Sequence, residues 1–217
     1  AALALDPRGE RALALRGRLR LEAALETWNV GVTVGGRVLP TWDERRQASL
    51  PLLKGSAEDF QTAIAEAPSD PSLHGGLGRT SWALSQLDAQ NAPQHLASAQ
   101  AAFSRAAVLA PNDPFAHWSL AVFAVPQGGR LSEIGLRAAR EAIEQDQGLL
   151  PDLVDRFLPL GLSGPQWVAM VPEAALDRAN LGALFEERGL RSEAAYAYQQ
   201  AIRVAPAGQA SLMRWML

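Results

Sequence analysis

The chain has 217 residues with a hydrophobic fraction of 48%, enough for one large domain or two small ones with a continuous core. Its 20 basic and 23 acidic residues give a net charge of −3, which argues against a partner bound through a nucleic-acid phosphate backbone. The absence of cysteine excludes disulfides and cysteine-ligated zinc. No stretch reaches the roughly 18–20 apolar residues that a membrane span requires.

Residues 8–28 are predicted to form one amphipathic helix, because leucine and alanine recur there at helical spacing. Four arginines surround this apolar stripe: Arg11, Arg16, Arg18 and Arg20. They either form an anion-binding face or lie on a solvated helix flank beside nearby glutamates of the same segment.

Residues 28–55 interrupt the helical pattern. Valines at alternate positions from 30 to 34 precede a pair of glycines, which predicts either a short β-hairpin or an ordered loop. Trp28 and Trp42 flank this stretch, and they either contact a partner or anchor the insertion to the helices. A helix is then expected to follow Lys54-Gly55-Ser56 and to end at Pro68.

Two junctions carry the same helix-start signal, Ser69-Asp70-Pro71 and Asn112-Asp113-Pro114. In each, the aspartate can accept hydrogen bonds from the free N–H groups of the first turn, and proline takes the first helical position, where no donor is needed. Helix pairs are therefore expected to begin at residues 71 and 114.

The pattern degrades between residues 148 and 171, where three prolines interrupt it. Two short helices are expected, near residues 153–158 and 166–171. Together they form a shortened half-repeat, which is predicted to bury three large side chains: Phe157, Trp167 and Met170.

The most regular stretch covers residues 175–208. Apolar residues fall on one face of a first helix and form one stripe of a second, and Gly189 and Pro206 end the two helices. The first face carries Leu176, Leu181, Leu184 and Phe185, and the second stripe carries Ala194, Tyr198, Ala201 and Ile202. Small residues thus lie where the two helices must approach closely.

This stretch resembles a tetratricopeptide repeat (TPR), a helical hairpin of about 34 residues. The matching positions are Leu181-Gly182, Phe185, Ala194, Tyr198, Ala201 and Pro206, while Arg178 replaces the usual Trp or Leu at the fourth position. A second copy has Leu77-Gly78 and Phe103 before Pro111. The closing prolines are not about 34 residues apart, so the array carries insertions.

The resemblance predicts an all-α, TPR-like helical-hairpin solenoid with an irregular insertion near residues 28–55. A single repeat domain is expected over residues 1–217, with repeats ending near residues 7, 68, 111, 147 and 206. Because both ends fall inside a repeat pattern, the chain is expected to be a fragment of a longer protein.

The resemblance also implies a scaffold that binds a peptide or a partner protein on a concave face, formed by the first helix of each hairpin. On the family's register the contact residues would be Arg79, Trp82, Phe115, Trp118, Val122, Ala183 and Glu186. Alternatively, the two tryptophans of this set lie in the core or contact the next module. No cofactor, nucleic acid or membrane span is expected for this chain.

A looser resemblance concerns the degenerate segment before Val171-Pro172 and the regular repeat after it. This order is similar to the TPR region that follows the membrane spans of bacterial O-antigen ligase or polymerase-like proteins. It implies, as an alternative, the extramembrane part of a glycan-assembly protein, in the bacterial cytoplasm or periplasm.

Catalysis within this chain is not expected. The three histidines, His74, His95 and His117, lack the converging ligands at helical spacing that a metal site needs. The run Gly75-Gly76-Leu77-Gly78 has neither the preceding strand nor the following Gly-Lys-Ser/Thr of a phosphate-binding loop.

Overall fold

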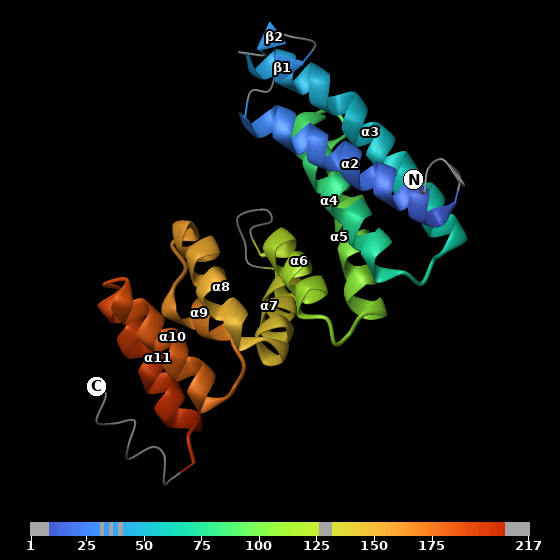
Figure 1. Ribbon diagram of the computed structural model, residues 1–217. Helices are drawn as coiled ribbons and strands as arrows, with labels where there is room; N and C mark the ends of the chain where they lie inside the picture. The colour runs from blue at the N-terminus through green and yellow to red at the C-terminus, as the bar shows by residue number, and fades with distance from the viewer. Residues whose placement is uncertain (1–8, 31–32, 35–36, 39–40, 126–131, 207–217) are drawn as a thin grey trace. The chain divides into compact units, whose positions relative to one another are not determined.

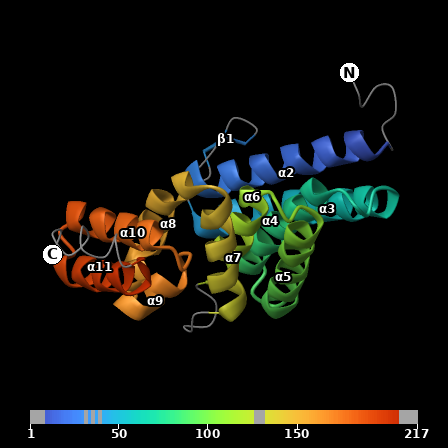
Figure 2. The same ribbon diagram turned by 90° about the horizontal axis from the view of Figure 1, so that it is seen from below.

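The computed structural model describes residues 9–30, 33–34, 37–38, 41–125 and 132–206. The chain divides into two compact units, Ala1–Pro111 and Asn112–Leu217. Each is built from neighbouring helices that pack in pairs (Figures 1 and 2). The single-domain organisation stays a prediction, and the repeat end expected near residue 7 lies outside the described residues.

The first unit pairs α2 with α3 and α4 with α5, and α3 also packs on α4. Its helices are α2 (Glu10–Val30), α3 (Trp42–Glu66), α4 (Pro71–Leu87) and α5 (Ala92–Leu109). Between α2 and α3 lie two short antiparallel strands, β1 (Thr33–Val34) and β2 (Arg37–Val38), with Thr33 opposite Val38. The β-hairpin alternative is therefore correct.

The irregular insertion is shorter than predicted, because α3 already begins at Trp42. Thr41 caps this helix: its hydroxyl accepts from the Glu44 N–H, and the Glu44 carboxylate accepts from the Thr41 N–H. Gly55 does not break the helix, since Arg20 lies over it and donates from Nη1 to the Gly55 carbonyl at 3.0 Å. A strong cap and an interhelical contact thus override the local glycine signal.

The two tryptophans beside the hairpin contact one another, with ring centroids 4.6 Å apart and planes at 62°. Trp28 also packs on a buried cluster that includes Leu21, Leu53 and Leu84, whereas 66% of Trp42 is exposed. Trp28 is therefore an anchor, and Trp42 covers it from the solvent side.

Two arginines of α2 bind a buried carboxylate on α3. For these two residues, both the anion-binding face and the solvated flank beside nearby glutamates were wrong. Asp59 is only 3% exposed. It accepts from Arg16 Nε at 3.0 Å and from Arg20 Nη1 at 2.8 Å, and Arg16 Nη2 also contacts it. The Asp59 hydrogen bond has the largest effect in raising the pKa of the Arg16 guanidinium. The pairing is interhelical, so it could not be seen from the spacing of charges within residues 8–28.

Aspartate caps begin α4 and α6, as the two junctions predicted. The Asp70 carboxylate accepts from the Ser72 N–H at 2.8 Å, and the Asp113 carboxylate accepts from the Phe115 N–H at 2.9 Å. Each cap satisfies one N–H group of a first turn that has no partner within the helix.

Glycine lies against an aromatic ring in one hairpin of each unit. A Cβ at Gly78 would lie 2.7 Å from the Phe103 ring, and one at Gly182 would lie 2.8 Å from the Tyr198 ring. These are the Leu-Gly and aromatic positions of the repeat pattern, and each ring occupies the space that a side chain would need. The prediction of an all-α, TPR-like helical-hairpin fold is confirmed.

Two alanine substitutions on α4 are expected to have opposite signs. Gly78→Ala would push Cβ into the Phe103 ring, which outweighs the helix propensity of alanine and lowers the free energy of unfolding by about 1–2 kcal/mol. Gly75→Ala meets nothing within 4 Å and is expected to raise it by about 0.5–1 kcal/mol. Urea unfolding followed by far-UV circular dichroism measures both changes, and equal signs would contradict the close approach.

The second unit contains six α-helices among its described residues, 112–125 and 132–206. They are α6 (Pro114–Ala124), α7 (Glu133–Gln145), α8 (Leu150–Phe157), α9 (Gly164–Ala169), α10 (Ala175–Glu187) and α11 (Arg191–Val204), with the 3₁₀ turns η2 (Gln147–Leu149) and η3 (Leu158–Leu160) flanking α8. The main pairs are α6 with α7 and α10 with α11.

The predicted half-repeat is present as α8 and α9. Phe157, Trp167 and Met170 are each at most 2% exposed, as expected. The Trp167 ring meets Phe185 of α10 edge to face, with centroids 5.2 Å apart. Short helices interrupted by proline therefore still contribute large core side chains.

Candidate functional site: a groove between α6 and α8

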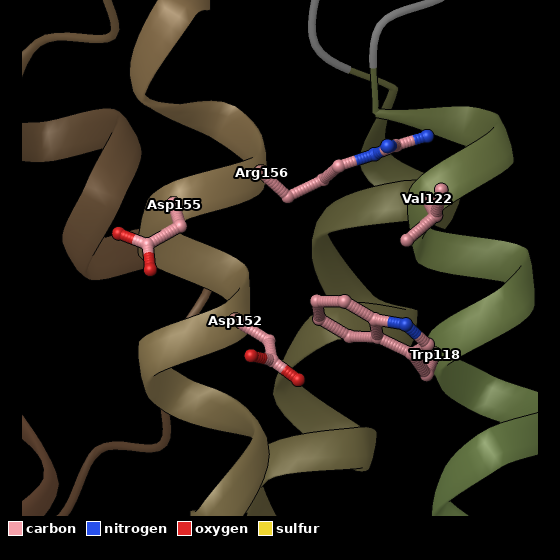
Figure 3. A pocket seen from close by; sticks show the side chains of 5 residues that line it. All are labelled: Trp118, Val122, Asp152, Asp155 and Arg156. Atoms are coloured by element: carbon pink, nitrogen blue, oxygen red, sulfur yellow. The ribbon is translucent and has the colours of Figure 1, made fainter.

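A hollow of about 520 Å³ lies in the second unit (Figure 3). One wall comes from α6, through Trp118 and Val122, and the other from α8, through Asp152, Asp155 and Arg156. We call this hollow the α6/α8 groove.

Helical periodicity builds the α6 wall. Trp118 and Val122 lie four residues apart and so share one face of the helix, while Leu120 and Ala121 are buried on another. The Trp118 ring also meets Phe157 of α8, with centroids 6.5 Å apart. This contact positions the indole at the groove, where it is half-buried.

The same periodicity gives α8 one apolar and one charged side. Leu153, Val154 and Phe157 are buried, whereas Asp152 and Arg156 are exposed. Four residues separate Asp152 from Arg156, so both lie on the side of α8 that lines the groove.

Asp155 already has a partner at the end of α10. Its Oδ1 accepts from Arg188 Nη2 at 2.6 Å and from Arg188 Nε at 2.8 Å. Figure 3 shows Asp155 pointing away from α6, on the opposite side of α8 from Trp118. Its charge is therefore offset, and it contributes less to the groove than its two charged neighbours.

Asp152 and Arg156 are not paired, although opposite charges at this helical spacing often attract. Within the described residues, neither side chain makes an ion pair or a hydrogen bond with another residue. Figure 3 shows the Arg156 side chain extending from α8 toward α6, on the Val122 side of the groove, while Asp152 points in near Trp118. The groove thus presents an aromatic surface and two separate charges of opposite sign.

Of the seven predicted contact residues, this groove brings together only Trp118 and Val122. Phe115 lies at the start of α6 and is 61% exposed, outside the groove lining. Ala183 and Glu186 lie on α10. Glu186 accepts a hydrogen bond from the Tyr198 hydroxyl at 3.2 Å. Burial has the largest effect in raising the pKa of the Tyr198 phenol, and this hydrogen bond has the second largest.

Arg79 and Trp82 belong to α4, in the other unit, where Arg79 is exposed and Trp82 half-buried. A second hollow of about 340 Å³ lies among α3, α4 and α5, and α4 contributes His74 and Leu77 to it. Leu77 and Arg79 point about 200° apart around the helix. Arg79 and Trp82 therefore do not line this hollow, and their role as contact residues stays a prediction.

None of the α8 residues that line the groove was among the predicted contact residues. Residues 148–171 were expected to supply only core side chains, because their repeat pattern is degenerate. A signal was nevertheless present: Asp152 and Arg156 recur at helical spacing opposite Leu153, Val154 and Phe157, which is typical of a helix with one free face.

Each histidine has a local contact. His74 Nε2 donates to the Pro68 carbonyl at 2.9 Å, His95 Nε2 lies 3.4 Å from Asp88, and His117 Nδ1 lies 2.9 Å from Glu141. Hydrogen bonds from Asn91 and, to a lesser degree, from His95 lower the pKa of Asp88. Over the described ranges, no three His, Asp or Glu side chains form a group that could hold a metal ion.

No protein-family model matches the chain, and no curated protein matches it. Solved structures that match the chain include TTC0263, a thermophilic TPR protein of Thermus thermophilus, at 16% identity and a TM-score of 0.49, covering 99% of this chain and 84% of that chain. MamA follows at 14% identity and a TM-score of 0.40, with 75% and 92% covered. YrrB, a TPR protein with an unusual peptide-binding site, has 16% identity and a TM-score of 0.37, with 100% and 96% covered.

At these identities the TPR-like assignment depends on the helix pairs and glycine–aromatic contacts of this chain. The looser resemblance to O-antigen ligase or polymerase-like proteins has no support in these comparisons. Across the described parts of the chain, no helix is both long enough and apolar enough to cross a bilayer.

Proposed function

We propose that the chain is a protein-interaction scaffold and that the α6/α8 groove binds an extended segment of a partner protein. The observation that carries this proposal is Trp118, an indole held against Phe157 that still lines an open hollow. Tryptophan is enriched among the residues that dominate binding energy at interfaces, because its large rigid surface loses little conformational entropy on binding.

The chemistry of the groove favours recognition over catalysis. Its lining combines an indole, an aliphatic side chain, one guanidinium and two carboxylates, one of which is engaged by Arg188. This lining has no hydroxyl nucleophile next to a histidine base, which is one of the common arrangements for nucleophilic catalysis. Apolar contact gives affinity to such a surface, and the charges give selectivity.

The proposal extends to the other predicted contact residues as additional surfaces on their own hairpins. These are Arg79 and Trp82 on α4, Phe115 on α6, and Ala183 and Glu186 on α10. The alternative role in a glycan-assembly protein has no specific observation in its favour.

Panning a random-peptide display library on the purified chain tests the proposal. Trp118→Ala is expected to weaken the enriched peptides at least tenfold, corresponding to a lost contact of about 1.4 kcal/mol or more. The double substitution of Arg79 and Trp82 by alanine serves as the matched control in the other unit. If every enriched peptide loses affinity only in this double variant, and none loses affinity in Trp118→Ala, the site lies on α4 and the groove proposal is wrong.

A further inference from the structure

We propose that the α6/α8 groove selects partner segments in which one basic and one acidic residue flank a single aromatic or large aliphatic residue. The inference rests on the proposed function, namely that the groove binds an extended peptide. It adds the chemistry of the occupant, which follows from the spacing and the charge state of the two walls.

The spacing of the charged wall matches the repeat of an extended chain. Asp152 and Arg156 lie four residues apart on α8, a rise of about 6 Å along the helix. In an extended segment, residues i and i+2 point to the same side and lie about 6.6 Å apart. Two side chains of the partner, separated by one residue, can therefore reach Asp152 and Arg156 together.

The residue between them then points to the opposite wall. Side chains of an extended chain alternate in direction, so the middle residue faces α6 when its neighbours face α8. That wall offers Trp118 and Val122, which suit an aromatic or large aliphatic side chain. Each wall thus accounts for one part of the triplet.

The charges are available because they are not used within the described fold. Asp155 is neutralised by Arg188, but Asp152 and Arg156 make no ion pair with any described residue. A basic side chain beside Asp152 and an acidic one beside Arg156 complement the groove. A partner with two basic or two acidic residues would instead place one of them beside a groove residue of like charge. Because an extended segment can run in either direction, the pattern of charges matters and their order does not.

Three blocked heptapeptides that differ only in their central triplet test the inference. The triplets are lysine–tryptophan–glutamate, lysine–tryptophan–lysine and glutamate–tryptophan–glutamate, each flanked by glycine and serine. Affinities are measured from the ¹H–¹⁵N indole signal of Trp118 at low salt. The mixed triplet is expected to bind at least about tenfold more tightly than either like-charged triplet, with a smaller preference at about 0.5 M salt, where charges are screened.

Two variants should redirect this preference. Arg156→Glu makes both positions acidic and should favour the lysine–tryptophan–lysine peptide, whereas Asp152→Lys makes both basic and should favour the glutamate–tryptophan–glutamate peptide. Arg191→Glu changes the net charge by the same amount as Arg156→Glu, but lies on an exposed part of α11, outside the groove lining, and should leave the preference unchanged.

The failures of the two proposals are distinguishable. Equal affinity of the native chain for the three peptides, with all binding lost in Trp118→Ala as measured by isothermal titration calorimetry, would overturn the charge selection and leave the proposed function standing. A preference that Arg156→Glu and Arg191→Glu alter equally would show an effect of net charge and would also overturn the selection. Absence of any shift in the Trp118 signal with all three peptides would overturn both proposals.

Discussion

Trp167→Ala is expected to lower the free energy of unfolding of the second unit by about 3–5 kcal/mol, the range for removing a large buried aromatic side chain. The indole is 1% exposed and packs edge to face on Phe185 of α10, with ring centroids 5.2 Å apart. It belongs to α9, a helix of only six residues. This helix also packs against α11. Without Trp167, this short helix loses its edge-to-face contact with Phe185 and a large buried side chain.

The measurement should separate the two units. Hydrogen–deuterium exchange read by mass spectrometry is expected to show faster exchange in α8 to α11, with exchange in α2 to α5 unchanged as an internal reference. Leu160→Ala is the matched control, because Leu160 lies a few residues before α9 but is 43% exposed, and its loss should change stability by less than about 1 kcal/mol. Equal effects of the two substitutions would contradict a core role for the half-repeat.

The helical core was predictable because the relevant signals are local. Leu-Gly followed by an aromatic residue in the next helix places Gly78 on Phe103 and Gly182 on Tyr198, and Asp-Pro marks the start of α4 and α6. Such patterns depend on helical periodicity and on the first turn of a helix, both of which are encoded within a few residues.

Contacts between helices were harder to predict. The position of the charged wall depends on how far α8 is rotated about its axis. Whether Arg156 pairs with Asp152, four residues away, or extends into the groove depends on the direction of its side chain. Asp155 has the same charge as Asp152 but is bound by Arg188, more than 30 positions later. Sequence spacing carries no information on such partners, so the family register placed Trp118 and Val122 among the predicted contact residues but gave no prediction for the α8 wall.

Asp59→Ala is expected to destabilise the first unit by about 2–3 kcal/mol. Removing one member of a fully buried ion pair costs about 3–5 kcal/mol, and the smaller value is expected here because water still reaches the cations. The side chains of Arg16 and Arg20 are 39% and 38% exposed, whereas the side chain of Asp59 is 4% exposed. Asp59→Asn, which keeps the volume and one acceptor oxygen, should have a smaller effect. Urea unfolding and exchange in α2 and α3 measure both.

The destabilising effect of Asp59→Ala should disappear or reverse when the two arginines are absent. With Arg16 and Arg20 both replaced by methionine, Asp59 becomes a buried carboxylate without a cation, and its ionised form is then costly. Asp59→Ala in that background is therefore expected to leave stability unchanged or to raise it, although the same substitution lowers it in the native chain. A double-mutant cycle measures the difference as an interaction energy. Equal losses in both backgrounds would mean that Asp59 acts through its volume alone and that the α2–α3 pair does not depend on the charge network.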